Sequence, residues 1–246
     1  MNARTFVVAL LGIIVGLSSS AHAQEPLEYA YPDISVWTTQ RDSDGKLKNP
    51  LVKLAKPLFE KAEIPWSAQD YPAKRMFERL RQGTSKFSML VNAKSALAGC
   101  CLLSKQRVAV VEIRMYRRPG SPAVLTKSDL NGKNVITIRG YSYAGWRNYI
   151  NEPSHNIVNN VAGDHMAAFS MLEAGRADYV LDYAGPAEEV LAAKSMEEDV
   201  TFDSVSQTDV FLVLNKKYPN AEQVMAKLET ILKTLDTSEF INAPGR

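Results

Sequence analysis

Hydrophobic positions along the chain follow two different periods, and the two alternate. Short apolar or alternating runs are typical of strands, and they predict strands at 27–31, 87–91, 108–116, 134–138, 157–161, 179–181 and 210–214. Apolar residues spaced three and four apart predict helices, which we expect at 51–62, 73–81, 142–150, 164–173, 186–193 and from 220 onward. Strands that alternate with helices in this way predict an α/β fold with a mostly parallel sheet.

Breaker and cap residues mark where several of these elements should end. Gly83 and Gly175 suit the left-handed conformation that ends a helix, and Pro57 should kink or shorten the helix that contains it. Asn220, with Gln223 three positions later, predicts a capped start for the last helix. The Pro- and Gly-containing stretch 118–122 is the best internal boundary, and we expect a second crossing between halves near 204–208.

The first residues have the three parts of a secretory signal peptide. A basic start precedes the apolar run Phe6–Leu17, and Ala21-His22-Ala23 is an A-x-A cleavage signal. The run is shorter than the roughly 20 apolar residues that a membrane-spanning helix needs. We therefore expect residues 1–23 to be removed and the protein to work in the periplasm of a Gram-negative-type cell, the alternative being a retained N-terminal anchor.

The charge balance narrows the choice of partners. The chain has 29 Lys and Arg against 27 Asp and Glu, with no basic stripe. Nucleic acid and anionic membrane are therefore poor partners. With 46% hydrophobic residues the chain can bury a sizeable core, and its length fits one large domain or two small lobes. We expect a monomer.

The cysteines do not predict a metal site. Cys100 and Cys101 are adjacent, and neither His155 nor His165 has a spacing to them that suggests zinc. In an oxidising compartment the pair could close a strained vicinal disulfide, and two buried reduced thiols are the alternative. The sequence predicts no metal and no cofactor.

Candidate binding residues follow predicted strands, because ligands of open α/β sheets bind beyond the carboxyl ends of the strands. One group is the turn made of Arg139, Gly140, Tyr141 and Ser142. Here the amides of a helix start suit an anion, and an ordinary capped turn is the alternative. Asp182 ends a buried strand, so its carboxylate needs a ligand ammonium or a backbone amide as partner.

Three further positions are candidates by the same rule. Asp164 either contacts a ligand or only caps a helix. Tyr31 and Trp37 follow the first strand and either stack on a ligand or pack in the core. Enzyme signatures are weak, since the chain has no G-x-S-x-G and no H-E-x-x-H.

Three motifs, taken in order, carry a family resemblance. Residues 129–135 are similar to a D-L-x-G-K-x-V pattern, and 172–179 to L-x-x-G-R-x-D-A. Residues 71–83 resemble a P-x-x-R-A…L-x-x-G pattern before a strand. Together with their spacing, these motifs resemble the family 3 extracellular solute-binding proteins, the periplasmic receptors of polar amino acid transporters, over essentially 27–236.

The resemblance implies a fold and a mode of action. That family has a two-lobed, periplasmic binding protein-like type II fold with a hinge and a central cleft. For this chain the resemblance implies that lobe 1 consists of residues 24–116 plus 208–246 and that lobe 2 consists of residues 117–207. It also implies hinge closure around a small polar solute, such as an amino acid or a similar amine or carboxylate. Delivery would be to an inner-membrane ABC permease or a sensor.

The resemblance also assigns roles within the site. Asp182 falls where the family often has the Asp that holds a ligand amine, and Arg139–Ser142 where it often has a G-T-S/T loop. The family's T-P-E-R motif, whose Arg grips the ligand carboxylate, has no counterpart at 91–97. Lys94, Arg75 or Arg139 would then take the anion, or the ligand is not an α-amino acid.

Two other functions remain open on this sequence. One is an enzyme on the same scaffold, since some relatives of the fold are dehydratases that act on cyclic precursors of phenylalanine. The absence of a clear acid–base pair counts against it. The other is an accessory protein that binds a protein partner through an exposed apolar patch.

The signal peptide gives the first testable prediction. Mass spectrometry of the exported protein should find an N-terminus at or within two residues of Gln24, because the A-x-A signal ends at Ala23. An exported form that retains Met1 would contradict the predicted processing.

Overall fold

The computed structural model describes residues 26–91 and 97–241, with the side chain of Glu239 excepted. The predicted leader and Lys94 lie outside the described residues. The strands are β1 (Leu27–Pro32), β2 (Trp66–Tyr71), β3 (Phe87–Val91), β4 (Cys101–Arg117), β5 (Asn134–Ile138), β6 (Val158–Ala162), β7 (Tyr179–Tyr183) and β8 (Thr201–Asn215). The helices are α1 (Pro50–Ala62), α2 (Ala73–Gln82), α3 (Trp146–Ile150), α4 (His165–Glu173), α5 (Ala184–Lys194) and α6 (Ala221–Leu232).

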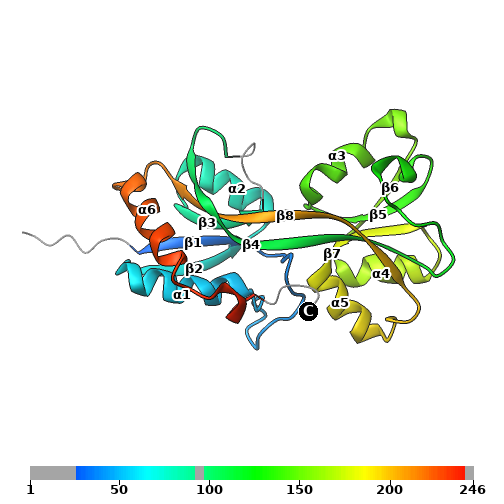
Figure 1. Cartoon of the computed structure of the whole chain (residues 1–246), viewed down its shortest axis with the longest axis horizontal. Coiled ribbons are helices and arrows are strands. Elements are labelled where there is room, and N and C mark those ends of the chain that lie inside the picture. The colour runs from blue at the N-terminus through cyan, green and yellow to red at the C-terminus, as the bar shows by residue number, and fades with distance from the viewer. Residues whose placement is uncertain (1–25, 92–96, 242–246) are drawn as a thin grey trace, which may run out of the picture.

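All eight strands belong to one sheet, in the order β2-β1-β3-β8-β4-β7-β5-β6. Figure 1 shows two groups of elements, and we call β1–β3 with α1, α2 and α6 lobe 1, and β5–β7 with α3–α5 lobe 2. Strand β1 is parallel to β2 and β3, and β5 is parallel to β6 and β7. The predicted α/β, two-lobed fold is therefore confirmed, whereas the residue boundaries of the lobes stay a prediction.

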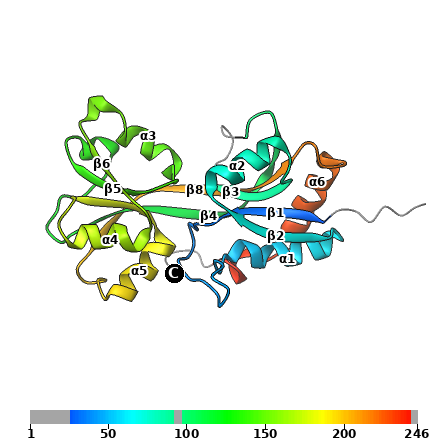
Figure 2. The same cartoon turned by 180° about the vertical axis from the view of Figure 1, so that it is seen from behind.

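Strands β4 and β8 run through both lobes (Figures 1 and 2). They pair with each other along almost their whole length, from Cys101 opposite Asn215 to Arg117 opposite Thr201. Strand β3 joins β8 only at 210–214, and β7 joins β4 only at 113–117. Between these points the two strands form a two-stranded ribbon, and three register irregularities lie along their pairing. Such irregularities bend and twist a strand pair.

The sequence underestimates both long strands. It predicts 108–116 and 210–214, whereas β4 has 17 residues and β8 has 15. The missed parts include Ser104–Arg107 and Asp203–Gln207, where polar residues replace the apolar alternation. Strand β2 was also missed, because its pattern of half-exposed and exposed positions carries few apolar residues.

Helix α1 continues through Pro57, contrary to the prediction that this residue shortens it. Proline removes one backbone bond, to the carbonyl of Lys53. That residue is exposed, while buried side chains such as Leu54 and Phe59 hold the other face against the core. Asn49 caps the helix by accepting a hydrogen bond from the Leu51 amide at 3.0 Å. The burial of one face therefore outweighs the lost bond.

One predicted helix cap and one predicted helix are wrong. Asn220 has φ 52° and makes no side-chain cap for α6, a conformation that asparagine tolerates. The expected helix at 142–150 is a 3-10 turn followed by a short α3, with Tyr143 and Ala144 both at φ 50°. The Tyr143 ring is fully buried and its hydroxyl oxygen accepts a hydrogen bond from the Ile138 amide at 2.9 Å. Tertiary packing of Tyr143 therefore overrides the local helical pattern.

Candidate functional site

A cavity of about 280 Å³ lies where the two lobes meet. Lobe 1 contributes the segment after β1, the start of α2 and the end of β3. Lobe 2 contributes the turn after β5 and the last residue of β7. These segments lie at the carboxyl ends of β1, β3, β5 and β7, where the strand-end rule expects a ligand.

The lining of this interlobe cavity is mostly apolar. Representative side chains are Ile34, Val36, Trp37, Met76, Phe77 and Met89 from lobe 1, and Tyr141 and Tyr183 from lobe 2. Among the described residues that line it, none is charged. Apart from the aromatic residues, the polar side chains there are Ser35, Asn49 and Ser142. The cavity is therefore shaped for apolar contact with few polar interactions.

Four of the predicted site residues line the cavity, namely Trp37, Gly140, Tyr141 and Ser142. Gly140 has φ 87°, a backbone conformation that favours glycine, whereas a Cβ at this position would meet the Ile34 Cδ1 atom at an ordinary contact distance of 3.5 Å. The turn after β5 therefore needs a glycine for its backbone conformation rather than for space. Ser142 is exposed and its side chain caps no helix, and the expected anion site at this turn stays a prediction.

The other predicted residues lie elsewhere. Arg139 is exposed, and Arg75 is exposed with its guanidinium 5.7 Å from the centre of the Tyr71 ring. Tyr31 is buried beside Tyr29, with 5.5 Å between ring centres. Asp164 caps α4 by accepting a hydrogen bond from the Ala167 amide at 2.8 Å. Their roles as ligand contacts stay predictions.

Asp182 is fully buried and is not among the residues that line the cavity. Its Oδ2 accepts a hydrogen bond from His165 Nδ1 at 2.8 Å, and its Oδ1 accepts from the Tyr183 amide at 2.8 Å. The sequence allowed a backbone amide as partner but did not identify His165. A histidine at the first position of a helix gave no signal that it faced a carboxylate on a neighbouring strand.

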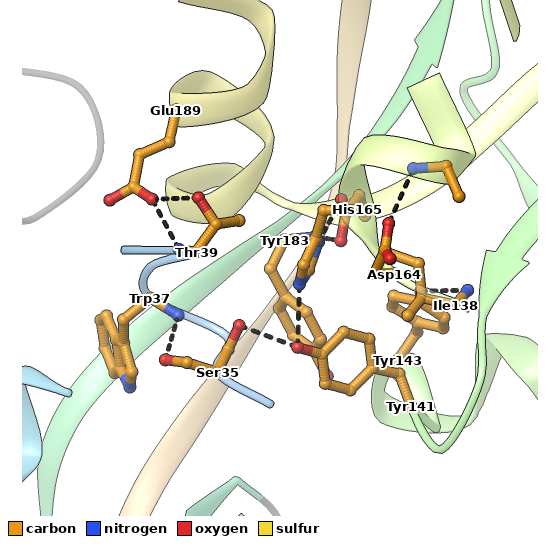
Figure 3. A network of polar contacts seen from close by, with 12 residues as sticks. Ser35, Trp37, Thr39, Ile138, Tyr141, Tyr143, Asp164, His165, Tyr183 and Glu189 are labelled. Atoms are coloured by element: carbon orange, nitrogen blue, oxygen red, sulfur yellow. Dashed lines mark hydrogen bonds and ion pairs between the residues drawn. The ribbon is translucent and has the colours of Figure 1, made fainter. Parts of the chain in front are cut away.

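His165 continues this chain of contacts toward lobe 1 (Figure 3). Its Nε2 lies 3.1 Å from the Tyr141 hydroxyl, which donates to the Ser35 carbonyl oxygen at 2.8 Å. The sequence analysis listed Tyr141 as a ligand contact but did not predict this link. The result is a polar chain from buried Asp182 in lobe 2 to the backbone of lobe 1.

The protonation of His165 decides whether this chain is satisfied. Burial on its own lowers the pKa of His165, but the charge and hydrogen bond of Asp182, with Asp164 and Glu189 further away, outweigh it and raise the pKa. Burial and the Asp182 charge also raise the pKa of Tyr141, so its hydroxyl keeps its single proton.

With His165 protonated, Nε2–H donates to the Tyr141 oxygen while the tyrosine proton is donated to Ser35. A neutral His165 that still donates from Nδ1 to Asp182 has an acceptor at Nε2. That acceptor competes with the Ser35 carbonyl for the one tyrosine proton. The protonated histidine therefore favours the contact between the lobes.

A second contact joins the lobes at α5. The Glu189 carboxylate accepts hydrogen bonds from the Thr39 hydroxyl at 2.7 Å and from the Thr39 amide (Figure 3). It also accepts one from the Thr38 hydroxyl at 2.7 Å. Beside it, the Trp37 carbonyl oxygen lies so close to Gly185 that a Cβ there would be 2.5 Å away. The segment after β1 is thus held against lobe 2 along several residues.

Neither cysteine lines the cavity, but both belong to a hydrophobic cluster whose Met76, Phe77 and Leu90 do line it. Both thiols are free, and the vicinal disulfide stays a prediction. Burial, with the neighbouring Cys100 thiol, raises the pKa of Cys101 to about 12. Its thiol is therefore a poor nucleophile at neutral pH. No group of three or more potential metal ligands occurs within the described residues.

Comparisons with known proteins support the fold. No protein-family model and no curated protein sequence matches the chain. Solved structures do match, among them an ancestral arginine-binding protein bound to arginine, with TM-score 0.67 and 14% identity over 88% of this chain and 99% of that chain. The ligand-binding core of GluR0 in complex with L-glutamate gives TM-score 0.69 and 13% identity over 89% and 97%.

A histidine kinase sensor domain with similarity to periplasmic binding proteins also matches, with TM-score 0.67 and 16% identity over 87% of this chain and 92% of that chain. The fold is that of the two-lobed solute-binding proteins. At these identities the likeness concerns the fold alone. In the part of the chain that the structure describes, no helix is long and apolar enough to span a membrane.

The first prediction from this site concerns pH. Because the folded-state pKa of His165 is raised, its contribution to stability is full below the unfolded pKa of about 6.5. It is then lost as the pH rises through the folded pKa. Urea unfolding between pH 6 and 9 should show this decline in the wild type and not in His165→Gln.

His155→Gln is the matched control and should keep the decline, since His155 stacks on Tyr149 outside the chain of contacts. Asp182→Asn should remove the decline and also cost about 3 kcal/mol, because it leaves a buried group without its charged partner. An unchanged pH profile in His165→Gln would show that this histidine does not link protonation to stability.

The second prediction concerns the close approach at Gly185. The Gly185→Ala substitution should lower the free energy of unfolding by about 1–3 kcal/mol, because its methyl group collides with the Trp37 backbone. Gly163→Ala is the control, since a Cβ there meets nothing within 4 Å. Equal stability of the two variants, measured by chemical denaturation, would argue against a tight contact between the lobes.

Proposed function

We propose that this protein binds one small solute reversibly in the interlobe cavity and acts as a receptor outside the cytoplasm. The observation that carries the proposal is a cavity lined by both lobes, at the ends of four strands. The two-stranded ribbon of β4 and β8 joins these lobes and suits a hinge that opens and closes the cavity. Binding rather than chemistry is the activity that this arrangement supports.

Solved structures of the same fold support this proposal. Their titles describe binding of arginine and of L-glutamate, and one is a sensor domain. Delivery of the solute to an inner-membrane ABC permease or to a sensor is the corresponding role for this chain, and the predicted signal peptide fits a periplasmic location. We infer this transporter or sensor partner from the fold alone, and no particular surface residue identifies it.

A dehydratase on the same scaffold is less well supported. Acid–base chemistry needs a group that exchanges protons near neutral pH and touches the substrate. No Asp, Glu, His or Lys is among the described residues that line the cavity. Tyr141 and Tyr183 line it, but burial raises the pKa of both. They are therefore suited to contact and hydrogen bonding rather than proton transfer.

A thermal-shift screen tests the proposal. The full chain is heated with amino acids, amines, carboxylates and uncharged small molecules, each in turn. A true ligand at about 100 times its dissociation constant should add roughly 2.7 kcal/mol of stability. Ser142→Trp should abolish the shift, because Ser142 lines the cavity and is exposed, so a large ring can fill the space without entering the core.

Ser154→Trp is the matched control, since Ser154 is equally exposed in lobe 2 but does not line the cavity. It should melt and bind as the wild type does. A solute shift that persists in Ser142→Trp places binding elsewhere, and a screen without any shift contradicts the proposed function.

A further inference from the structure

Three charged groups near the cavity are already engaged by the protein. The Arg147 guanidinium, next to the lining turn, donates to the carbonyl oxygens of Tyr141 and Ile138. Asp182 is paired with His165, and Glu189 accepts hydrogen bonds from the segment after β1. None of these three groups lines the cavity.

This arrangement is unfavourable for a charged ligand. An ammonium or carboxylate group loses its hydration on entering an apolar cavity. Only an ion pair or several hydrogen bonds can compensate for the free-energy cost of that loss. The described lining offers hydroxyls and one side-chain amide, and the Oδ1 atom of that amide, Asn49, already caps α1. An uncharged ligand avoids the loss of hydration.

One buried hydrogen-bond donor among the described lining residues has no partner. The indole Nε1 of Trp37 is buried and has no hydrogen-bond partner, and Trp37 lines the cavity. Buried N–H groups in native proteins are nearly always paired. Figure 3 shows the ring turned away from the Thr39–Glu189 contact. The backbone of Trp37 is fixed on both sides, because its amide donates to the Ser35 hydroxyl at 3.0 Å and its carbonyl lies against Gly185.

The size of the cavity limits the ligand further. Drug-sized ligands occupy pockets of about 300–1,000 Å³, and this cavity measures about 280 Å³. Aromatic and sulfur-containing side chains such as Phe77, Tyr141 and Met76 form part of its wall. A single ring with a short substituent therefore suits the space.

We propose that the cavity takes an uncharged, largely apolar small molecule with one hydrogen-bond acceptor, which the Trp37 indole N–H meets. This inference rests on the proposed function and names the ligand class for the same site. It differs from the polar amino acid that the family resemblance implies, because it follows from the lining residues of this chain.

Four substituted benzenes of nearly equal size test the proposal by calorimetric titration of the full chain. Acetophenone has an uncharged acceptor, ethylbenzene has none, benzoate is an anion and benzylamine is a cation. Acetophenone should bind most tightly. Ethylbenzene should bind about 3- to 10-fold more weakly, as expected for one neutral hydrogen bond. Benzoate and benzylamine should bind more weakly still.

Trp37→Phe keeps an aromatic ring and removes the donor. It should weaken acetophenone binding by about 3- to 10-fold and leave ethylbenzene binding unchanged. Trp66→Phe is the matched control, since Trp66 packs on Phe59 outside the cavity, and it should change neither. A purely structural role for Trp37 would instead weaken both ligands together.

Three outcomes overturn the inference. These are tighter binding of benzoate or benzylamine than of acetophenone, equal acetophenone affinity in Trp37→Phe, and no binding by any of the four compounds. Tighter binding of an ion that Ser142→Trp blocks would overturn the ligand class and leave the proposed function intact. Failure of every solute in the wider thermal-shift screen would overturn both.

Discussion

The antiparallel pairing of β4 with β8 is the interaction on which the rest of the structure depends. Each strand joins the sheet of one lobe through a second neighbour, β7 for β4 and β3 for β8. The strand ends that build the cavity face each other because this shared ribbon sets the spacing of the lobes. Between its anchored ends the ribbon has a single hydrogen-bonded ladder, so its middle resists bending less than a wide sheet does.

The short-range pattern of the chain predicts most of the fold. Strands β3 and β5 have the predicted bounds, and α1, α2 and α4 begin within one residue of expectation, because alternation and helical spacing are local properties. The first part of β8 was missed because none of residues 203–207 is buried, so no buried apolar alternation marks it. The turn at Tyr143 was missed because its positive φ is maintained by packing against Tyr141 and Tyr183. Such packing does not appear in local periodicity.

Part of the cavity lining was expected from the sequence, whereas its chemistry was not. The strand-end rule, which depends only on topology, pointed to the turn after β5 and to Trp37, and both line the cavity; their role as ligand contacts stays a prediction. The same rule indicated Asp182, which ends a strand as expected but is covered by His165 and Tyr141. Whether a strand-end carboxylate faces a cavity or a neighbouring helix depends on side-chain packing over long sequence distances, which a single sequence does not show. The apolar lining likewise comes from α2 and β3, whose buried faces look like ordinary core in the sequence.

Under the proposed function, the segment 33–39 would couple ligand binding to the contact between the lobes. Ser35 and Trp37 line the cavity. The carbonyl oxygen of Ser35 accepts a hydrogen bond from the Tyr141 hydroxyl, and the carbonyl oxygen of Trp37 lies against Gly185. A ligand that orders this segment therefore also stabilises the contacts to α5 and to the Tyr141–His165–Asp182 chain. A ligand shifts such an equilibrium only by the difference in its affinity for the open and closed arrangements. A solute that touches both Trp37 and the lobe 2 turn has this difference, because opening separates its two sets of contacts. Under the same proposal, closure would depend on the proton on His165, because the Tyr141–His165–Asp182 chain joins the lobes, and solute and pH would then act on one equilibrium.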